Sequence, residues 1–170
     1  DGFFSDLYTG CADMGIPAQT AISESGIGQF EVNLNHQDAM RCADDTLLFK
    51  VLVRGLARKH GFAATFMAKP YDDDAGNGMH VHFSVVDQDG RNIFDDGSDT
   101  GSELLKQAVA GCLAAMPAST LIFAPQGNSY DRLVPGAHAP TSAAWGYENR
   151  TAAIRFPGGS PVARRIEHRV

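Results

Sequence analysis

The chain has 170 residues, 44% of them apolar, and a formal net charge of -6. We therefore expect one domain, or part of a larger one, without a general nucleic-acid surface. Its three cysteines (Cys11, Cys42 and Cys112) lie far apart, which argues against a zinc knuckle or disulfide framework and favours a cytoplasmic location. No apolar run of membrane-spanning length and no signal peptide is visible, so no membrane partner is expected. The abrupt first and last residues indicate a fragment.

Hydrophobic spacing in the first half predicts two helices around a hairpin. The helices are expected over residues 4–14 and 38–60, and the hairpin strands over 17–25 and 29–35. Gly15 and Gly61 are expected to end the two helices. A further strand is predicted over 62–68.

The second half is richer in strands. We expect strands over 79–87 and 163–170, a strand–turn–strand unit over 143–156, and a helix over 102–116 that ends before Pro117. Strands joined by tight turns and interrupted by two long helices predict an α+β fold. Its sheet would be largely antiparallel and flanked by helices on one side.

A Gly-rich turn (residues 69–78) leads into an apolar strand that carries a His-x-His pair. Alternate side chains of a strand share a face, so His80, His82 and Ser84 would line one face, while Val81 and Phe83 would line the core. The polar face could present imidazoles to a ligand. Alternatively, the two histidines are simply hydrogen-bonded on a half-buried strand.

The hairpin carries two glutamates. If its strands pair symmetrically around the loop 26–29, Glu24 lies opposite Glu31, and two facing carboxylates repel each other. A divalent cation would compensate this repulsion. The alternative is that one glutamate points to water.

The last strand places Arg165, Glu167 and Arg169 on one face. Alternating charges are common on a solvated edge strand, so a functional role requires this strand to be central. No P-loop or dinucleotide-binding glycine motif is present, so a bound nucleotide would depend on arginines and metals.

Three further arginines, Arg132, Arg150 and Arg155, precede that strand. The arginine fork binds two oxygens at once, which suits a phosphorylated or doubly anionic substrate. Surface arginines that only aid solubility are equally consistent with any one of them.

Four segments in this order resemble the glutamine synthetase family. They are the hairpin from Glu24 to Glu31, the stretch from Lys69 to Ser84, the loop from Asn128 to Gly136 with Ala139-Pro140, and the arginine-rich strands from Asn149 to Arg169. The resemblance spans nearly the whole chain. It implies a partial catalytic domain over residues 1–170, without the family's N-terminal β-grasp domain and C-terminal helices.

The resemblance also implies ligand sites. Glu24 and Glu31 would bind one metal, and His80 and Glu167 a second, with Mg²⁺ and Mn²⁺ left open. The remaining assignments are His82, Ser84 and Arg165 for ATP, Gly76, Arg132 and Arg155 for L-glutamate, and Arg150, Arg169 and His138 for catalysis.

The implied reaction is ATP-dependent ligation. ATP would phosphorylate the γ-carboxylate of L-glutamate, and ammonium or a small amine would then displace phosphate. The family builds its sites between the subunits of a homo-oligomeric ring. Without the β-grasp domain and its share of these sites, the fragment alone would be inactive or nearly so.

Two positions depart from the family pattern. His138 stands where a glutamate normally closes the ammonium site, and Val162 stands where many members have a lysine near the nucleotide. Losing the anion weakens an ammonium site, which favours the γ-glutamyl-amine ligase branch that uses putrescine or similar amines. A non-catalytic relative and a His-x-His metal hydrolase are the alternatives.

Overall fold

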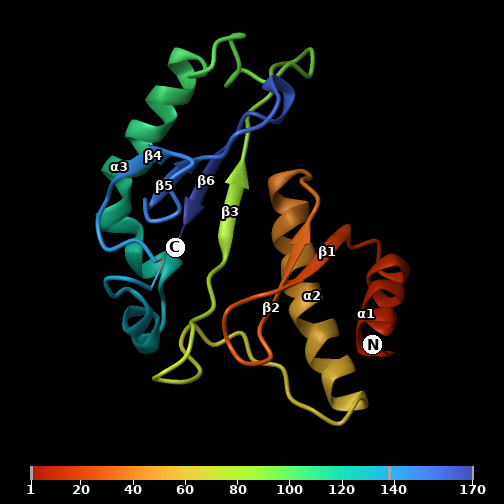
Figure 1. Cartoon of the computed structure of the whole chain (residues 1–170). Helices are drawn as coiled ribbons and strands as arrows, with labels where there is room; N and C mark the ends of the chain where they lie inside the picture. Colours follow the sequence, from red (N-terminus) through yellow and green to blue (C-terminus); the bar gives the residue numbers. More distant parts are fainter. Residues whose placement is uncertain (1, 138, 170) are drawn as a thin grey trace.

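The computed structural model describes residues 2–137 and 139–169. Its first half pairs two helices, α1 (Gly2–Asp13) and α2 (Ala39–Lys59), with an antiparallel hairpin of β1 (Ala18–Ser23) and β2 (Phe30–Leu34). Figure 1 shows this half to the right, in red to yellow. Its core contains Leu7, Cys11, Ile16, Phe49 and Val53.

The second half is a four-stranded sheet with one long helix. The strand order is β3 (His80–Phe83), β6 (Ile166–Arg169), β5 (Ile154–Phe156) and β4 (Trp145–Tyr147). The helix α3 (Glu103–Phe123) packs against one face of this sheet through Leu105, Val109 and Met116, which share a core cluster with Ile154, Phe156 and Ile166. β6, the strand that carries Glu167 and Arg169, is therefore central in the sheet rather than at its edge. A functional role for these charged residues requires that position.

The predicted α+β class is confirmed, and the sheet is largely antiparallel. β6 pairs antiparallel with β3 and β5, whereas β4 and β5 pair parallel. Two short 3₁₀ helices, η1 (Gly127–Arg132) and η2 (Pro161–Ala163), lie in the loops. Gly15 and Gly61 follow α1 and α2 with φ of 68° and 81°, the left-handed conformation expected just past a helix.

The predicted end of the third helix at Pro117 is wrong, because α3 continues to Phe123. Pro117 has no N–H to donate to the Leu113 carbonyl, yet the helix continues to Phe123, whose ring stacks on His168. This extension gives α3 the length and composition of a membrane span, contrary to the sequence expectation. A helix that packs on a protein core passes the same test, so this is weak evidence for a membrane partner.

Two strand predictions also need correction. Residues 62–68 have no strand partner in the described chain and are irregular, and β3 covers only residues 80–83 of the predicted 79–87. Phe83 packs on the core as expected, but Val81 is 40% exposed. β-rich composition alone does not form a strand where the backbone has no neighbour to pair with.

Candidate active site

Three facing side chains form a row across the sheet. His82 of β3 and Arg155 of β5 both lie in register with Glu167 of β6. Glu167 Oε1 lies 3.3 Å from His80 Nδ1, 3.5 Å from His82 Nε2 and 2.8 Å from Arg169 Nη1, while Arg155 Nε donates to Oε2. One carboxylate, only 2% exposed, thus contacts four basic side chains.

This neighbourhood sets the charge of Glu167. Burial raises the pKa of its carboxyl, but hydrogen bonds from His80 and Arg155 and the charges of Arg169 and Arg155 outweigh burial and lower the pKa to about 2. Glu167 is therefore an anion at neutral pH.

His82 is held in one tautomer by its neighbours. Arg165 Nε donates to His82 Nδ1 at 3.0 Å, so the neutral ring carries its proton on Nε2, which faces Glu167. Burial lowers the pKa of His82, and the attraction of Glu167 opposes this only in part. The imidazole is thus kept neutral and oriented.

Arg132 reaches this cluster from η1 and rests on the Gly-rich turn. A Cβ on Gly76 would lie 2.6 Å from the Ala68 carbonyl and 2.7 Å from Arg132 Cγ, and one on Gly78 would lie 2.9 Å from Arg132 Nη2. Only glycine allows this approach. Burial lowers the pKa of Arg132, and the positive charge of Arg169 adds to the effect. No carboxylate pairs with Arg132 among residues 2–137 and 139–169, so the two neighbouring guanidiniums favour an anion.

The hairpin loop docks onto the same Gly-rich turn. Gln29 Nε2 donates to the Gly76 carbonyl at 2.9 Å and to Asn77 Oδ1 at 2.8 Å, and the Ile27 N–H donates to Asp74 Oδ2 at 2.9 Å. Sequence reasoning did not identify Gln29 as this link. Its position directly after Gly-x-Gly was the available signal.

The predicted hairpin register is wrong by two residues. Glu31 lies opposite Ile22 rather than Glu24, because the Glu24 N–H bonds to the Gln29 carbonyl. A two-residue shift keeps both glutamates on one face but makes them diagonal neighbours, about 7–8 Å apart. The facing repulsion inferred from sequence is therefore weaker.

Several predicted residues lie apart from the cluster. Glu24, Ser84 and Arg150 are exposed, Glu31 is half-buried, and none of them makes an ion pair within the described residues. His138 lies outside the described residues, so its role stays a prediction. Val162 is 86% exposed.

The chain offers an incomplete metal site. His80 and Glu167 are an imidazole and a carboxylate of the kind that Mg²⁺ or Mn²⁺ accepts. Within residues 2–137 and 139–169, however, no group of three or more such side chains is arranged to hold an ion. The donor types fit the metal, but the number of donors does not complete its coordination.

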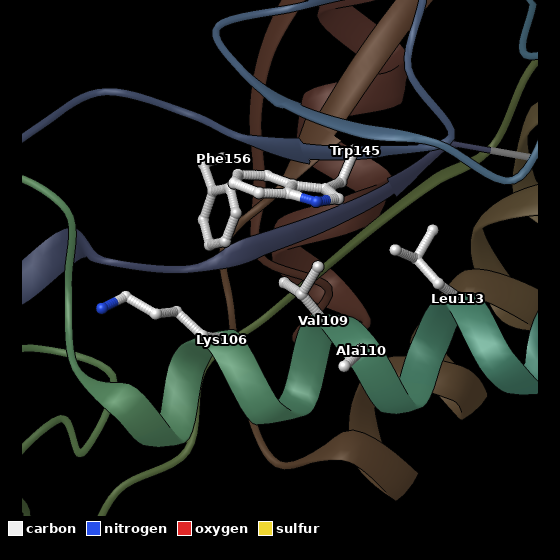
Figure 2. Close-up of a pocket in the computed structure, with 6 residues that line it drawn as sticks. All are labelled: Lys106, Val109, Ala110, Leu113, Trp145 and Phe156. Carbon is white, nitrogen blue, oxygen red and sulfur yellow. The ribbon is translucent and has the colours of Figure 1, made fainter.

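An apolar groove lies on the opposite face of the sheet. Figure 2 shows Trp145 and Phe156 facing the side chains of α3, with Lys106 at one end. Phe156 follows Arg155, so adjacent residues of β5 serve opposite faces. The groove contains no carboxylate, imidazole or thiol, which leaves the Glu167 side as the candidate active site.

Fold and site together define an α+β protein whose central strand carries a buried carboxylate within a cluster of cations. Residues 1–170 match the family described as "Glutamine synthetase, catalytic domain", and the chain belongs to this family. The expectation from sequence is thus confirmed.

Individual relatives agree with this assignment. The chain is 47% identical over 156 residues to "Gamma-glutamylputrescine synthetase PuuA" of Escherichia coli, covering 91% of the chain and 33% of the relative. It is 42% identical to "Glutamine synthetase" of Halobacterium salinarum, covering 92% and 35%. The solved Plasmodium falciparum glutamine synthetase matches 99% of the chain with a TM-score of 0.94 at 28% identity, over 33% of its own length. The chain spans about a third of each relative.

Proposed function

We propose that this chain is part of the catalytic domain of an ATP-dependent ligase that joins the γ-carboxylate of L-glutamate to ammonia or a small amine. The observation that carries the proposal is the charge balance at Glu167. Arg155 and Arg169 contact this one buried carboxylate. Arg165 donates to the adjacent His82, and Arg132 lies close enough to Arg169 to feel its charge, so the cluster has an excess of positive charge. Such an excess suits phosphates and substrate carboxylates, which bring several negative charges.

The proposed roles follow the family pattern. Arg132 and Arg155 hold glutamate and its γ-phosphate, Gly76 offers its backbone to glutamate, and Arg150 and Arg169 stabilise the transferring phosphoryl group. His82, Ser84 and Arg165 bind ATP. Glu24 and Glu31 would contribute to one divalent-metal site, and His80 and Glu167 to a second. When bound, Mg²⁺ or Mn²⁺ neutralises phosphate charge.

The chemistry proceeds in two displacements. A γ-carboxylate oxygen attacks the γ-phosphorus of ATP, ADP leaves, and γ-glutamyl phosphate forms. A neutral amine then attacks the γ-carbonyl carbon, its nitrogen gives up one proton, for which His138 is the proposed base, and phosphate leaves as the C–O bond breaks. In this chain, the arginines would spread the charge of both displacements, and the neutral His82 would keep Glu167 oriented.

We further propose an organic amine as acceptor, with His138 in place of the usual glutamate. The 47% identity to a relative named for γ-glutamylputrescine supports this choice. The full-length protein is proposed to be a cytoplasmic homo-oligomer. A non-catalytic relative remains the second candidate, but such a protein has no need to keep these charges together.

The test is amine-dependent phosphate release by the full-length protein with glutamate, ATP and Mg²⁺. Ammonium, methylamine, ethanolamine and putrescine are compared, with glutamate omitted as control. We expect putrescine or another organic amine to give the highest kcat/KM. Preference for ammonium would refute the amine assignment while keeping the ligase, and no release with any amine would support the non-catalytic relative.

A further inference from the structure

The connection between β4 and β5 is unusually short. Parallel strands are normally joined by about a dozen residues or more, whereas Tyr147 and Ile154 are separated by residues 148–153 alone. Glu148 begins this connection with φ of 49°, and it is the one non-glycine residue with positive φ in the described part of the chain. A left-handed conformation brings the Cβ of a residue too close to the neighbouring carbonyl oxygen, so it is unfavourable for residues other than glycine. Such a cost at a glutamate calls for a compensating contact.

The carboxylate of Glu148 makes two contacts at once. Oε1 accepts from the backbone N–H of Gly158, in the loop that follows β5, and Oε2 lies 3.6 Å from Arg155 Nη1. The Glu148 N–H also donates to the Phe156 carbonyl at 3.0 Å. A Cβ on Gly158 would lie 2.9 Å from Oε1, so glycine at that position lets the carboxylate approach without having to shift.

Arg155 is therefore bound from two directions. Its Nε donates to Glu167 and its Nη1 faces Glu148, while its side chain is only 11% exposed. A guanidinium is a rigid planar fork with five N–H donors. Two carboxylates at different nitrogens fix the orientation of that plane, and the remaining donors stay available to a ligand.

We infer that Glu148 is a positioning residue for Arg155, the proposed ligand of the glutamate γ-carboxylate and its phosphate. This inference rests on the proposed function. Glu148 also joins the loop of residues 148–153, which carries Arg150, to the loop of residues 157–160. The left-handed backbone at Glu148 directs the carboxylate to both partners. Had the position served only to turn the chain, glycine would serve better.

The test compares Glu148→Gly and Glu148→Gln in the full-length protein, with Glu103→Gln at an exposed carboxylate of α3 as control. Glu148→Gly relieves the left-handed strain, so its Tm should be unchanged or raised. Its KM for glutamate should nevertheless rise about tenfold, with the KM for ATP within twofold of wild type. Glu148→Gln keeps an acceptor for Gly158 but loses the charge, so its KM for glutamate should rise about threefold. An unchanged KM for glutamate in Glu148→Gly overturns the inference.

A second readout needs no activity, so it separates this inference from the proposed function. If the wild-type protein releases no phosphate with any amine, the proposed function fails, and a thermal-unfolding cycle of Glu148→Gly, Arg155→Gln and both together decides the contact. Glu148→Gly is made both in the wild type and in Arg155→Gln, so the stability that glycine gains from the relieved backbone strain is the same in both and cancels in the comparison. A Tm shift in the double variant that differs from the sum of the single shifts supports the Glu148–Arg155 contact, and additive shifts overturn it.

Discussion

Glu167 illustrates how neighbouring side chains determine the properties of one residue. A buried carboxylate is unfavourable unless charged donors surround it, and here two arginines and two histidines do so. Removing that anion would leave Arg169 buried without a counter-charge, and Arg155 would keep only the exposed Glu148. We therefore expect Glu167 to contribute to stability as well as to the proposed chemistry.

At neutral pH, Glu167→Gln should destabilise the full-length protein by about 3–5 kcal/mol, the usual cost of breaking a buried ion pair from one side. It should also reduce amine-dependent phosphate release at least a hundredfold. Urea unfolding measures the first effect and steady-state kinetics the second. The control Glu103→Gln removes a carboxylate from an exposed pair with Lys106, so its effect should stay within about 0.5 kcal/mol. Equal effects of the two substitutions would contradict this account of Glu167.

The lowered pKa of Glu167 predicts a pH dependence of stability. Its pKa falls from 4.5 to about 2 on folding, so the stabilisation is complete above pH 4.5 and is lost as the pH falls toward 2. The shift corresponds to roughly 3 kcal/mol. In urea unfolding, the free energy of unfolding of the wild type should exceed that of Glu167→Gln at pH 7, and this difference should shrink as the pH falls to 2.5. If the difference in unfolding free energy between the two proteins stayed constant from pH 7 to pH 2.5, the pKa of Glu167 would not be lowered by folding, and this account would be contradicted.

Among the elements, the hairpin loop and the Gly-rich turn act as one unit through Gln29. Its side chain joins residues 26–29 to Gly76 and Asn77, next to Arg132. A shift of the hairpin would therefore move the turn that Arg132 contacts.

Gln29→Ala should cost about 1–3 kcal/mol, since three side-chain hydrogen bonds, with Gly26, Gly76 and Asn77, are lost and their partners stay partly buried. Hydrogen exchange at the amides of residues 26–29 and 76–77 should accelerate together. Asn33→Ala, on exposed β2 surface, is the control and should be nearly neutral. Acceleration confined to the hairpin would show that the turn is held without Gln29.

Two glycines should respond in opposite ways to alanine. Gly55 lies within α2 with nothing within 4 Å of an added Cβ, so Gly55→Ala should stabilise by about 0.5–1 kcal/mol. Gly76→Ala would place a Cβ 2.6 Å from the Ala68 carbonyl and should destabilise by about 1–3 kcal/mol. Urea unfolding of both variants measures this, and a neutral Gly76→Ala would mean that the turn relaxes without cost.

Sequence patterns predicted elements better than their boundaries and pairing. Periodicity located α1, α2 and the strand bearing His80 and His82, since burial follows the helix and strand repeats. It could not foresee that α3 would continue past Pro117 to Phe123, which stacks on His168. The hairpin register is set where the Glu24 N–H bonds to the Gln29 carbonyl and the Gln29 side chain holds the Gly-rich turn. The strand expected over 62–68 does not form, because no neighbouring strand pairs with it in the part of the chain that the structure describes. Both are tertiary effects that a local pattern does not contain.

The candidate site was predictable in part. The motifs of the family resemblance singled out residues that the fold does bring together, including His80, His82, Arg155 and Glu167. Glu148 was missed because its role depends on a left-handed backbone and on a contact with Gly158, ten residues away. The metal and catalytic roles of Glu24, Glu31 and Arg150 stay predictions.

In the whole molecule, the two halves meet at the proposed site. One half contributes the hairpin and the other the central sheet, and the Gly-rich turn contacts both through Gln29 and Arg132. The chain spans about a third of its relatives, and within its described residues the proposed metal sites have too few donors to enclose an ion.

The central claim is that phosphate leaves from an activated glutamate. The direct test supplies the full-length protein with ATP, the preferred amine and glutamate carrying ¹⁸O in both γ-carboxylate oxygens, and then measures the released phosphate by mass spectrometry. The account predicts one ¹⁸O in each phosphate, because the attacking carboxylate oxygen leaves with the phosphoryl group when the amine displaces it. Phosphate without ¹⁸O would show that water cleaves ATP directly, and it would contradict the γ-glutamyl phosphate route.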